Sequence, residues 1–231
     1  TDSGDITLEG TATAATATAG VRVTGNGLTT NGGDIRVTGS SAGGVGVQLG
    51  DGGAFAIGSG GGSITIEGTG IDAGVLMQGN QVTSGGGAVS ITGTGATIGV
   101  SLEGSDIDSA GGGIDIDGIA SAAGGIGVSL YDAQLTGGAG DVIVRGTAAA
   151  GIGIQFGYGS AISTTTGAIG LYGTGADFGL DIADGALDTD SGDITLEGTA
   201  TAATATAGVR VTGDGLVTNG GDITVTGSSA G

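Results

Sequence analysis

The chain has 231 residues, of which 59 are glycine, and it contains no proline, cysteine, histidine or tryptophan. Its only cations are four arginines against 23 carboxylates, and the formal net charge of −19 argues against binding to nucleic acid or to an anionic membrane surface, because both attract basic patches. A hydrophobic share of 38% is too high for a disordered chain, the lack of proline and of a glycine triplet period excludes collagen, and the lack of cysteine excludes disulfides and thiolate metal sites.

The sequence carries no signal for the membrane. No run approaches the roughly 18 consecutive apolar residues that a membrane-spanning helix needs. Thr1 stands inside a repeat and not at the charged start of a signal peptide, so any export signal is expected outside this sequence. We therefore predict no membrane insertion.

A long repeat organises the whole chain. Residues 1–43 return at 189–231, an offset of 188 residues, and we interpret the sequence as part of a tandem array. Residues 1–188 form one predicted block of seven coils and residues 189–231 begin the next, in one continuous solenoid without a linker. Three of the 43 repeated positions differ: Asn26 against Asp214, Thr29 against Val217, and Arg36 against Thr224.

A shorter repeat lies inside the block. The motif G-[DSAG]-[IV]-x-[ILV]-x-G recurs at steps of 25 to 29 residues, and its first apolar residues, the first anchors, are Ile6, Ile35, Ile64, Val89, Ile114, Val142, Ile169, Ile194 and Ile223. A second apolar run, usually after a glycine, gives the second anchors Val21, Val47, Val75, Val100, Val128, Ile154, Leu180 and Val209. The third anchors are Leu28, Ile57, Val82, Ile107, Leu135, Ile162, Leu187 and Leu216.

The spacing of these anchors separates a fixed corner from a free one. From each third anchor to the next first anchor the distance is 7 residues, as from Leu28 to Ile35, which indicates a turn that does not vary. From first to second anchor the distance ranges from 11 to 15 residues, so insertions accumulate there. Such short, alternating runs predict strands with one buried face.

Three short strands in each unit predict an all-β fold, a right-handed parallel β-helix (β-solenoid) with about 27 residues per coil. The right hand is expected because parallel crossovers in one sheet almost always take it. A propeller or sandwich needs antiparallel strands within each unit, and a propeller blade of about 40 to 50 residues exceeds the unit found here.

The register predicts which side chains are buried. Ile35 and Val37 point inward, so Arg36 points to solvent, as does Thr29, and Asn26 lies in a turn. The glycines of the fixed corner are expected to supply positive φ. A small residue follows each third anchor by two places, and an inward column of hydroxyls is expected there to hydrogen-bond the corner backbone: Thr30, Ser59, Ser84, Ser109, Gly137, Thr164, Thr189 and Thr218.

Outward carboxylates are the candidates for chemistry on polysaccharides. On the first strands only Asp115 and Asp117 form a pair, about 7 Å apart along the strand. The nearest arginine, Arg145, is placed two coils away and the chain has no lysine or histidine, so an acid/base site lacks partners. We predict a solvated acidic face, no catalytic or cofactor-binding residue, and a protein that is not an enzyme.

Other motifs suggest ligands less strongly. GGAGD at 137–141 resembles glycine–aspartate calcium repeats, but its aspartate is one place early and the period is about 27. We predict no metal site and no cofactor, and binding of calcium stays an open alternative. The threonine-rich segment 11–20 raises ice binding, but that function needs the same two outward threonines in every coil, whereas this insert occurs once per seven coils and the outward column mixes Glu, Arg, Asp and Gly. Among six aromatics, Phe156 and Phe178 are expected in the core, and Tyr172 alone points outward, too little for a sugar-stacking cleft.

The repeated units resemble a known group of proteins. GDITLEGTATAA, GGSITIEGTG and GDVIVRGTAAAG are similar to the β-strand repeat regions of very large secreted bacterial proteins, the filamentous haemagglutinin and two-partner-secretion adhesins. The resemblance covers the whole chain as a pattern of glycine-bounded I-x-[ILV] strands, with coils longer than in most adhesin shafts. It implies a long β-helical shaft that holds a binding tip away from the cell or builds extracellular matrix.

We therefore expect a structural section of a long extracellular fibre or adhesin stalk, at the cell surface or in the extracellular matrix. Tandem blocks would lengthen it, and its partners would be neighbouring copies of the same repeat, end to end. Two alternatives remain: a self-assembling extracellular filament or sheath subunit, and a polysaccharide-acting β-helix enzyme whose cleft contains Asp115 and Asp117.

Overall fold

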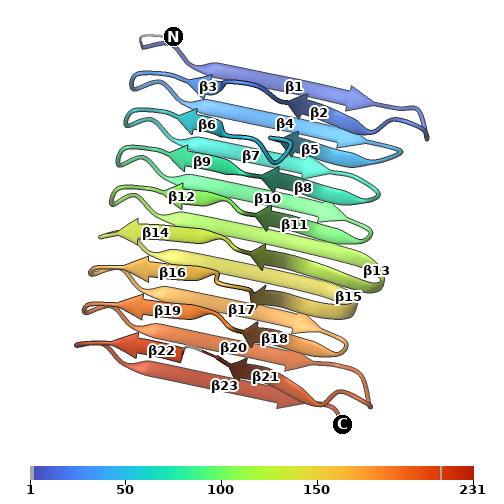
Figure 1. Ribbon diagram of the computed structural model, residues 1–231. Coiled ribbons are helices and arrows are strands. Elements are labelled where there is room, and N and C mark those ends of the chain that lie inside the picture. Colours follow the sequence, from blue (N-terminus) through green and yellow to red (C-terminus); the bar gives the residue numbers. More distant parts are fainter. Residues whose placement is uncertain (1–2, 214) are drawn as a thin grey trace.

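The computed structural model describes residues 3–213 and 215–231, and these residues form 23 strands and no helix. The strands pair in parallel from coil to coil, and the stacked coils make a β-solenoid of about eight turns with roughly 27 residues each, as predicted (Figure 1). Asp214, one of the three positions that differ between the copies, lies outside the described residues.

Each coil contributes strands of three kinds. The first strands, which begin at the first anchors, are β1 (Ile6–Ala12), β4 (Ile35–Ser41), β7 (Ile64–Thr69), β10 (Val89–Gly95), β17 (Ile169–Gly175), β20 (Ile194–Ala200) and β23 (Ile223–Ser229). The second strands are β2 (Ala19–Val23), β5 (Val45–Leu49), β8 (Ala73–Gln78), β11 (Ile98–Glu103), β18 (Phe178–Ala183) and β21 (Ala207–Thr212). The third strands are β3 (Gly27–Thr29), β6 (Phe55–Gly58), β9 (Asn80–Thr83), β12 (Asp106–Asp108), β14 (Gln134–Gly138), β16 (Ala161–Thr164), β19 (Ala186–Thr189) and β22 (Gly215–Thr218).

In two coils the first and second strands are one continuous strand, so the prediction of three short strands per coil is wrong there. These are β13 (Ile114–Tyr131) and β15 (Val142–Gly157). Their backbones turn the free corner through register shifts between Ala120, Ala123 and Gly125, because bulges let a strand bend without ending. The two long strands join all first and second strands into one 15-stranded sheet, and the third strands form a separate 8-stranded sheet.

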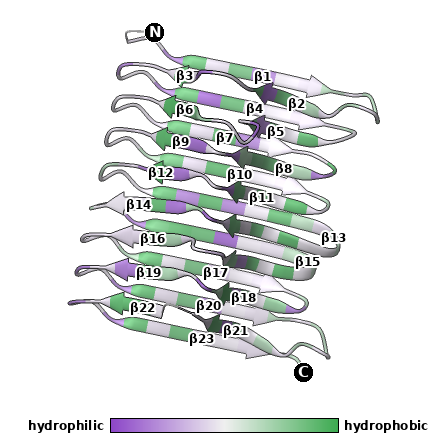
Figure 2. Cartoon of the chain, in the orientation of Figure 1, coloured by the Kyte–Doolittle hydropathy of each residue, from purple (hydrophilic) through white to green (hydrophobic). Residues whose placement is uncertain are grey.

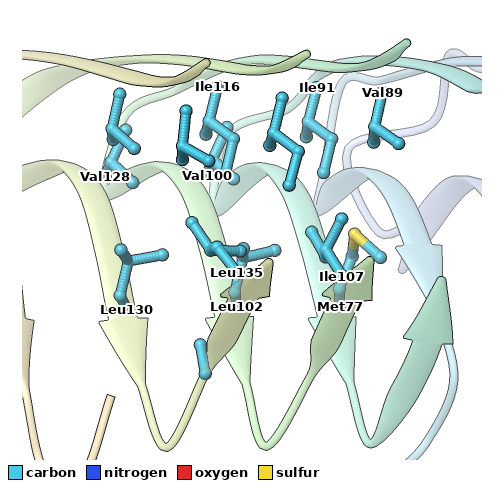
Figure 3. Packing of buried hydrophobic residues seen from close by; sticks show 14 of the residues in the cluster. Met77, Val89, Ile91, Val100, Leu102, Ile107, Ile116, Val128, Leu130 and Leu135 are labelled. Atoms are coloured by element: carbon cyan, nitrogen blue, oxygen red, sulfur yellow. The ribbon is translucent and has the colours of Figure 1, made fainter. Parts of the chain in front are cut away.

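The core consists of aliphatic columns that run along the solenoid. Equivalent residues pair directly: Val89 lies between Ile64 and Ile114 in the first strands, and in the third strands Ile107 pairs with Leu135. Figure 3 shows such inward side chains in rows along successive coils. In Figure 2 the first strands are hydrophobic mainly in their first half, where these anchors lie.

Glycine columns at the free corner explain the last residue of the repeated motif. A Cβ on Gly93 would lie 2.1 Å from the carbonyl oxygen of Gly99, and a Cβ on Gly68 would lie 2.0 Å from that of Gly74. The first and second strands of one coil therefore approach backbone to backbone at this edge, where no side chain fits. The same close approach holds from Gly39 to Gly46 in the neighbouring coil.

At the fixed corner the predicted hydroxyl column is confirmed. Thr30, Ser59 and Ser84 are buried, and each hydroxyl lies 2.5–2.6 Å from the carbonyl oxygen three residues later and 3.0–3.1 Å from a carbonyl oxygen of the next coil. At Gly137 there is no room for a side chain, because a Cβ would lie 2.5 Å from the Gly140 oxygen. Positive φ at the corner glycines also occurs as predicted, for instance at Gly32, Gly60, Gly61, Gly85, Gly86, Gly111 and Gly138.

The differences between the two copies lie on the outside, as predicted. Arg36, Thr29 and Asn26 are exposed. Their described counterparts Val217 and Thr224 are exposed as well. Drift between the copies has thus changed solvent-facing positions and left the columns intact.

Candidate functional surfaces

The outer side of the first strands, called here the first face, presents three columns of side chains. They come from the second, fourth and sixth residues of each first strand, since alternate residues point outward. The fourth-residue column carries most of the charge and consists of Glu9, Thr38, Glu67, Thr92, Asp117, Arg145, Tyr172, Glu197 and Thr226.

Asp115, Asp117 and Arg145 meet on this face. Arg145 is the register partner of Asp117 in the adjacent coil, so the predicted separation of two coils is wrong; Ile114 and Val142 are successive first anchors. Its Nη1 lies 2.7 Å from Asp115 Oδ1, with both side chains about half exposed. The same guanidinium lies 5.8 Å from the ring centre of Tyr172.

Burial raises the pKa of Asp117 above its ordinary value, and the neighbouring Asp115 carboxylate raises it further, while Arg145 acts in the opposite direction. Asp117 therefore holds a proton more readily than a free aspartate does. Because Arg145 is engaged with Asp115, the cluster is a partly neutralised patch in which one carboxyl has a modestly altered affinity for protons.

The sixth-residue column is a feature that sequence reasoning missed. It consists of hydroxyl residues in every coil but one, which has Ile119. Neighbouring hydroxyls approach within hydrogen-bonding distance, as Ser40 Oγ and Thr11 Oγ1 do at 3.3 Å. The first four members of this column, together with Glu9 and Glu67, line a shallow hollow of about 500 Å³. The hydroxyl members are Thr11, Ser40, Thr69, Thr94, Thr147, Thr174, Thr199 and Ser228.

The threonine-rich insert that suggested ice binding belongs to a corner and not to a face. Residues 13–18 connect β1 to β2 as an exposed turn, in which Ala17 N donates to Ala14 O at 2.9 Å. In the second copy Ala205 N donates to Ala202 O at the same distance. The insert therefore presents no flat rank of threonines.

Asp141, the aspartate of the GGAGD segment, has a structural contact. Its Oδ1 accepts a hydrogen bond of 2.8 Å from Ala168 N in the next coil. In other coils the aspartate at the same motif position also accepts a hydrogen bond from a backbone amide of the next coil. Asp5 accepts from Asp34 N, Asp34 from Ser63 N and Asp193 from Asp222 N. Within residues 3–213 and 215–231 no three acidic side chains gather in a way that could hold a metal ion.

The aromatic residues divide between core and surface. Phe156 is fully buried, as predicted, whereas Phe178 is only partly buried and lies under the Arg210 guanidinium at 4.2 Å. Sequence reasoning missed that Tyr131 and Tyr158 stack on each other, with ring centres 4.9 Å apart. Alignment of the anchors pairs Tyr131 with Gly157. It therefore misses the contact with Tyr158, which is the next residue along the chain.

No protein-family model, no curated protein and no solved structure matches this chain. Across the described ranges there is also no helix long and apolar enough to cross a membrane. The class of protein is therefore defined by the fold itself: a parallel β-solenoid of tandem repeats.

Proposed function

We propose that this chain is a section of the shaft of a long extracellular fibre or adhesin stalk, lengthened by adding copies of the 188-residue block. The role is mechanical: to hold two points at a fixed distance. Support comes from the interface between coils, in which each strand pairs with its equivalent, corner hydroxyls lie within hydrogen-bonding distance of backbone carbonyl oxygens of the next coil, and aspartate carboxylates accept from its backbone amides.

One observation carries the proposal. Across the boundary between the copies, β20 pairs with β17 in the register used by every other first strand, with Ile194 on Ile169 and Leu196 on Leu171. Within the second copy, β20 and β23 repeat the β1–β4 register residue for residue, with Ile194 on Ile223 as Ile6 lies on Ile35. A new block can therefore be added without any new kind of contact.

The surface chemistry is compatible with an extracellular location and a passive role. The chain has no cysteine to be oxidised and a net charge of −19, which keeps long solenoids apart in solution. In this proposal the carboxylates of the first face are solvating groups, and Asp115 is the partner of Arg145.

Electron microscopy of chains with one, two and three copies of residues 1–188 tests the proposal. Seven coils about 4.8 Å apart should add about 34 Å of length per copy, in straight particles of constant width. Lengths that do not rise with copy number would overturn the shaft. Polymers that lengthen with protein concentration would favour the filament alternative, and cleavage of polysaccharide that is lost in Asp115→Ala would favour the enzyme.

A further inference from the structure

In most coils the corner after the second strand has a left-handed backbone at the same position, and three adjacent coils do not use glycine for it. The residue four places after the second anchor has positive φ in seven coils, and in three of these it is Asp132 (φ 51°), Tyr158 (φ 55°) or Asp184 (φ 54°). A bulky residue such as tyrosine is disfavoured in this conformation. The remaining four coils have the expected glycine: Gly25, Gly79, Gly104 and Gly213.

These three residues lie side by side on one edge, because they directly follow the paired residues Tyr131, Gly157 and Ala183. The Tyr158 ring stacks on the Tyr131 ring at an interplanar angle of 21°. Both are exposed to water, Tyr131 at 50% and Tyr158 at 69%. A strained backbone thus holds two aromatic rings on the surface, where burial does not explain them.

The turn beneath the rings is well anchored. Ser160 Oγ donates to Gly157 O at 2.7 Å, and Gln134 Nε2 donates to Gly159 O at 2.8 Å. The Gly159 amide also donates to Asp184 O in the next coil at 3.1 Å. Tyr158 is consequently preorganised, which lowers the entropy that a ligand must remove on binding.

A hollow of about 340 Å³ adjoins the rings and is lined by polar groups of successive coils, among them Ser129, Gln155, Asp181 and Asp184. Asp181 is buried and held by Arg210, whose Nε and Nη2 donate to its two oxygens at 2.6 and 2.5 Å. Within the part of the chain that the structure describes, the Ser129 hydroxyl and the Gln155 side-chain amide make no hydrogen bond to another protein group. An aromatic platform beside uncommitted donors and acceptors is the usual composition of a small-molecule site.

We propose that this hollow, with Tyr158 as its platform, binds a neutral glycan. The apolar face of a pyranose ring would lie on the tyrosine, and its hydroxyls would bond to Gln155, Ser129 and Asp184. Asp132, Asp181 and Asp184 outnumber the Arg210 cation, so uronic acid or sulfated sugars are repelled. The two rings lie nearly parallel and do not enclose a cation as an aromatic cage does.

The site goes beyond the shaft role and does not depend on it. If the array proposed above exists, each block carries one such site, about 34 Å from the next. Weak single contacts would then add up along one glycan-covered surface.

An array of neutral hexose and N-acetylhexosamine oligosaccharides, followed by calorimetric titration of the best ligand, tests the proposal on the full 231-residue chain. Tyr158→Ala should weaken binding about tenfold or more, as loss of a central aromatic contact does. Gln155→Ala should weaken it less, and Tyr172→Ala, whose ring lies on the first face, is the matched control that should leave it unchanged.

Tyr158→Gly separates the site from the fold. Glycine fits the positive φ, so this variant should melt at a higher temperature and bind no sugar. Retention of the sugar by Tyr158→Gly, a lower melting temperature in that variant, or no binding to any glycan on the array would overturn the proposal. Binding of tetramethylammonium without binding of sugar would overturn it in favour of a cation site.

Discussion

The strands β4 and β23 have the same sequence apart from Arg36 and Thr224, yet they differ completely in burial. Ile35 and Val37 of β4 are 1% and 0% exposed, whereas the equivalent Ile223 and Val225 of β23 are 44% and 50% exposed. The two strands differ in their neighbours: β4 lies between β1 and β7 and packs against β5 of its own coil, whereas β23 pairs with β20 alone.

The strands β1 and β20, which have identical sequences, show the same effect near the start of the chain. Leu8 in β1, with a neighbour on one side, is partly buried, but Leu196 in β20, with neighbours on both sides, is 0% exposed. The inward side chains of a first strand therefore become fully interior only when coils lie both above and below them. This is the nearest-neighbour behaviour expected of solenoids.

The largest expected effect comes from truncating the same side chain in both settings. Ile35→Ala should lower the free energy of unfolding by about 3–4 kcal/mol, because it leaves a cavity between two coils. Ile223→Ala should lower it by about 1 kcal/mol or less, because the side chain is already half in water. Urea denaturation of both variants provides the test, and equal losses would contradict the comparison.

The glycine column allows a second matched pair. Gly39→Ala should cost about 3 kcal/mol, since its Cβ would lie 2.2 Å from the Gly46 oxygen and only backbone movement relieves this. At the equivalent Gly227 the nearest atom is Val209 N at 3.2 Å, and alanine there should be neutral or stabilise by about 0.5 kcal/mol. The two melting temperatures should shift in different directions or by clearly different amounts.

Adding one coil should remove the difference between β4 and β23. With residues 44–72 appended after Gly231, the inward side chains of β23 would gain the neighbour that β4 has, worth about 2 kcal/mol for the two half-exposed residues. Hydrogen exchange of residues 223–229 should then slow toward the rate in β4. Exchange that stays fast in the extended chain would show that stacking is not the cause.

The smallest effect concerns the corner hydroxyls. Thr30→Val should cost about 1.5 kcal/mol, because the Gly33 carbonyl oxygen, 2.6 Å from this buried hydroxyl, loses it as a donor. Thr218→Val should cost about 0.5 kcal/mol, since this residue is only partly buried and water can replace the hydroxyl. Thermal melts of the two variants side by side measure the difference, and a cost that is the same at both corners would argue against it.

The sequence was sufficient to predict the coils because each column repeats one physical requirement. Alternation of Ile35, Arg36 and Val37 defines inside and outside, and the constant distance from Leu28 to Ile35 defines a corner. The continuous strands β13 and β15 could not be foreseen in this way. Whether a run of alanine and glycine forms a loop or a bulged strand depends on the neighbouring coil to which it bonds.

The surface clusters were harder to predict than the core. The contact of Arg145 with the Asp115–Asp117 strand follows from the anchors once successive coils are aligned. The contact between Tyr131 and Tyr158 does not, because it depends on a one-residue offset and on a left-handed backbone at Tyr158. The sequence gives one indication of the positive φ at Tyr158. Four other coils have glycine at the equivalent position, and this coil does not.

Pulling force would act on this architecture in a particular way. The ladder bonds between coils run along the long axis, so tension on the two ends loads them one after another and peels a single turn at a time. Each turn of roughly 27 residues occupies about 4.8 Å of the rod and spans about 90 Å when drawn out. A tether built on this plan would be stiff at rest and would lengthen in steps under load, absorbing a sudden pull without breaking its covalent chain.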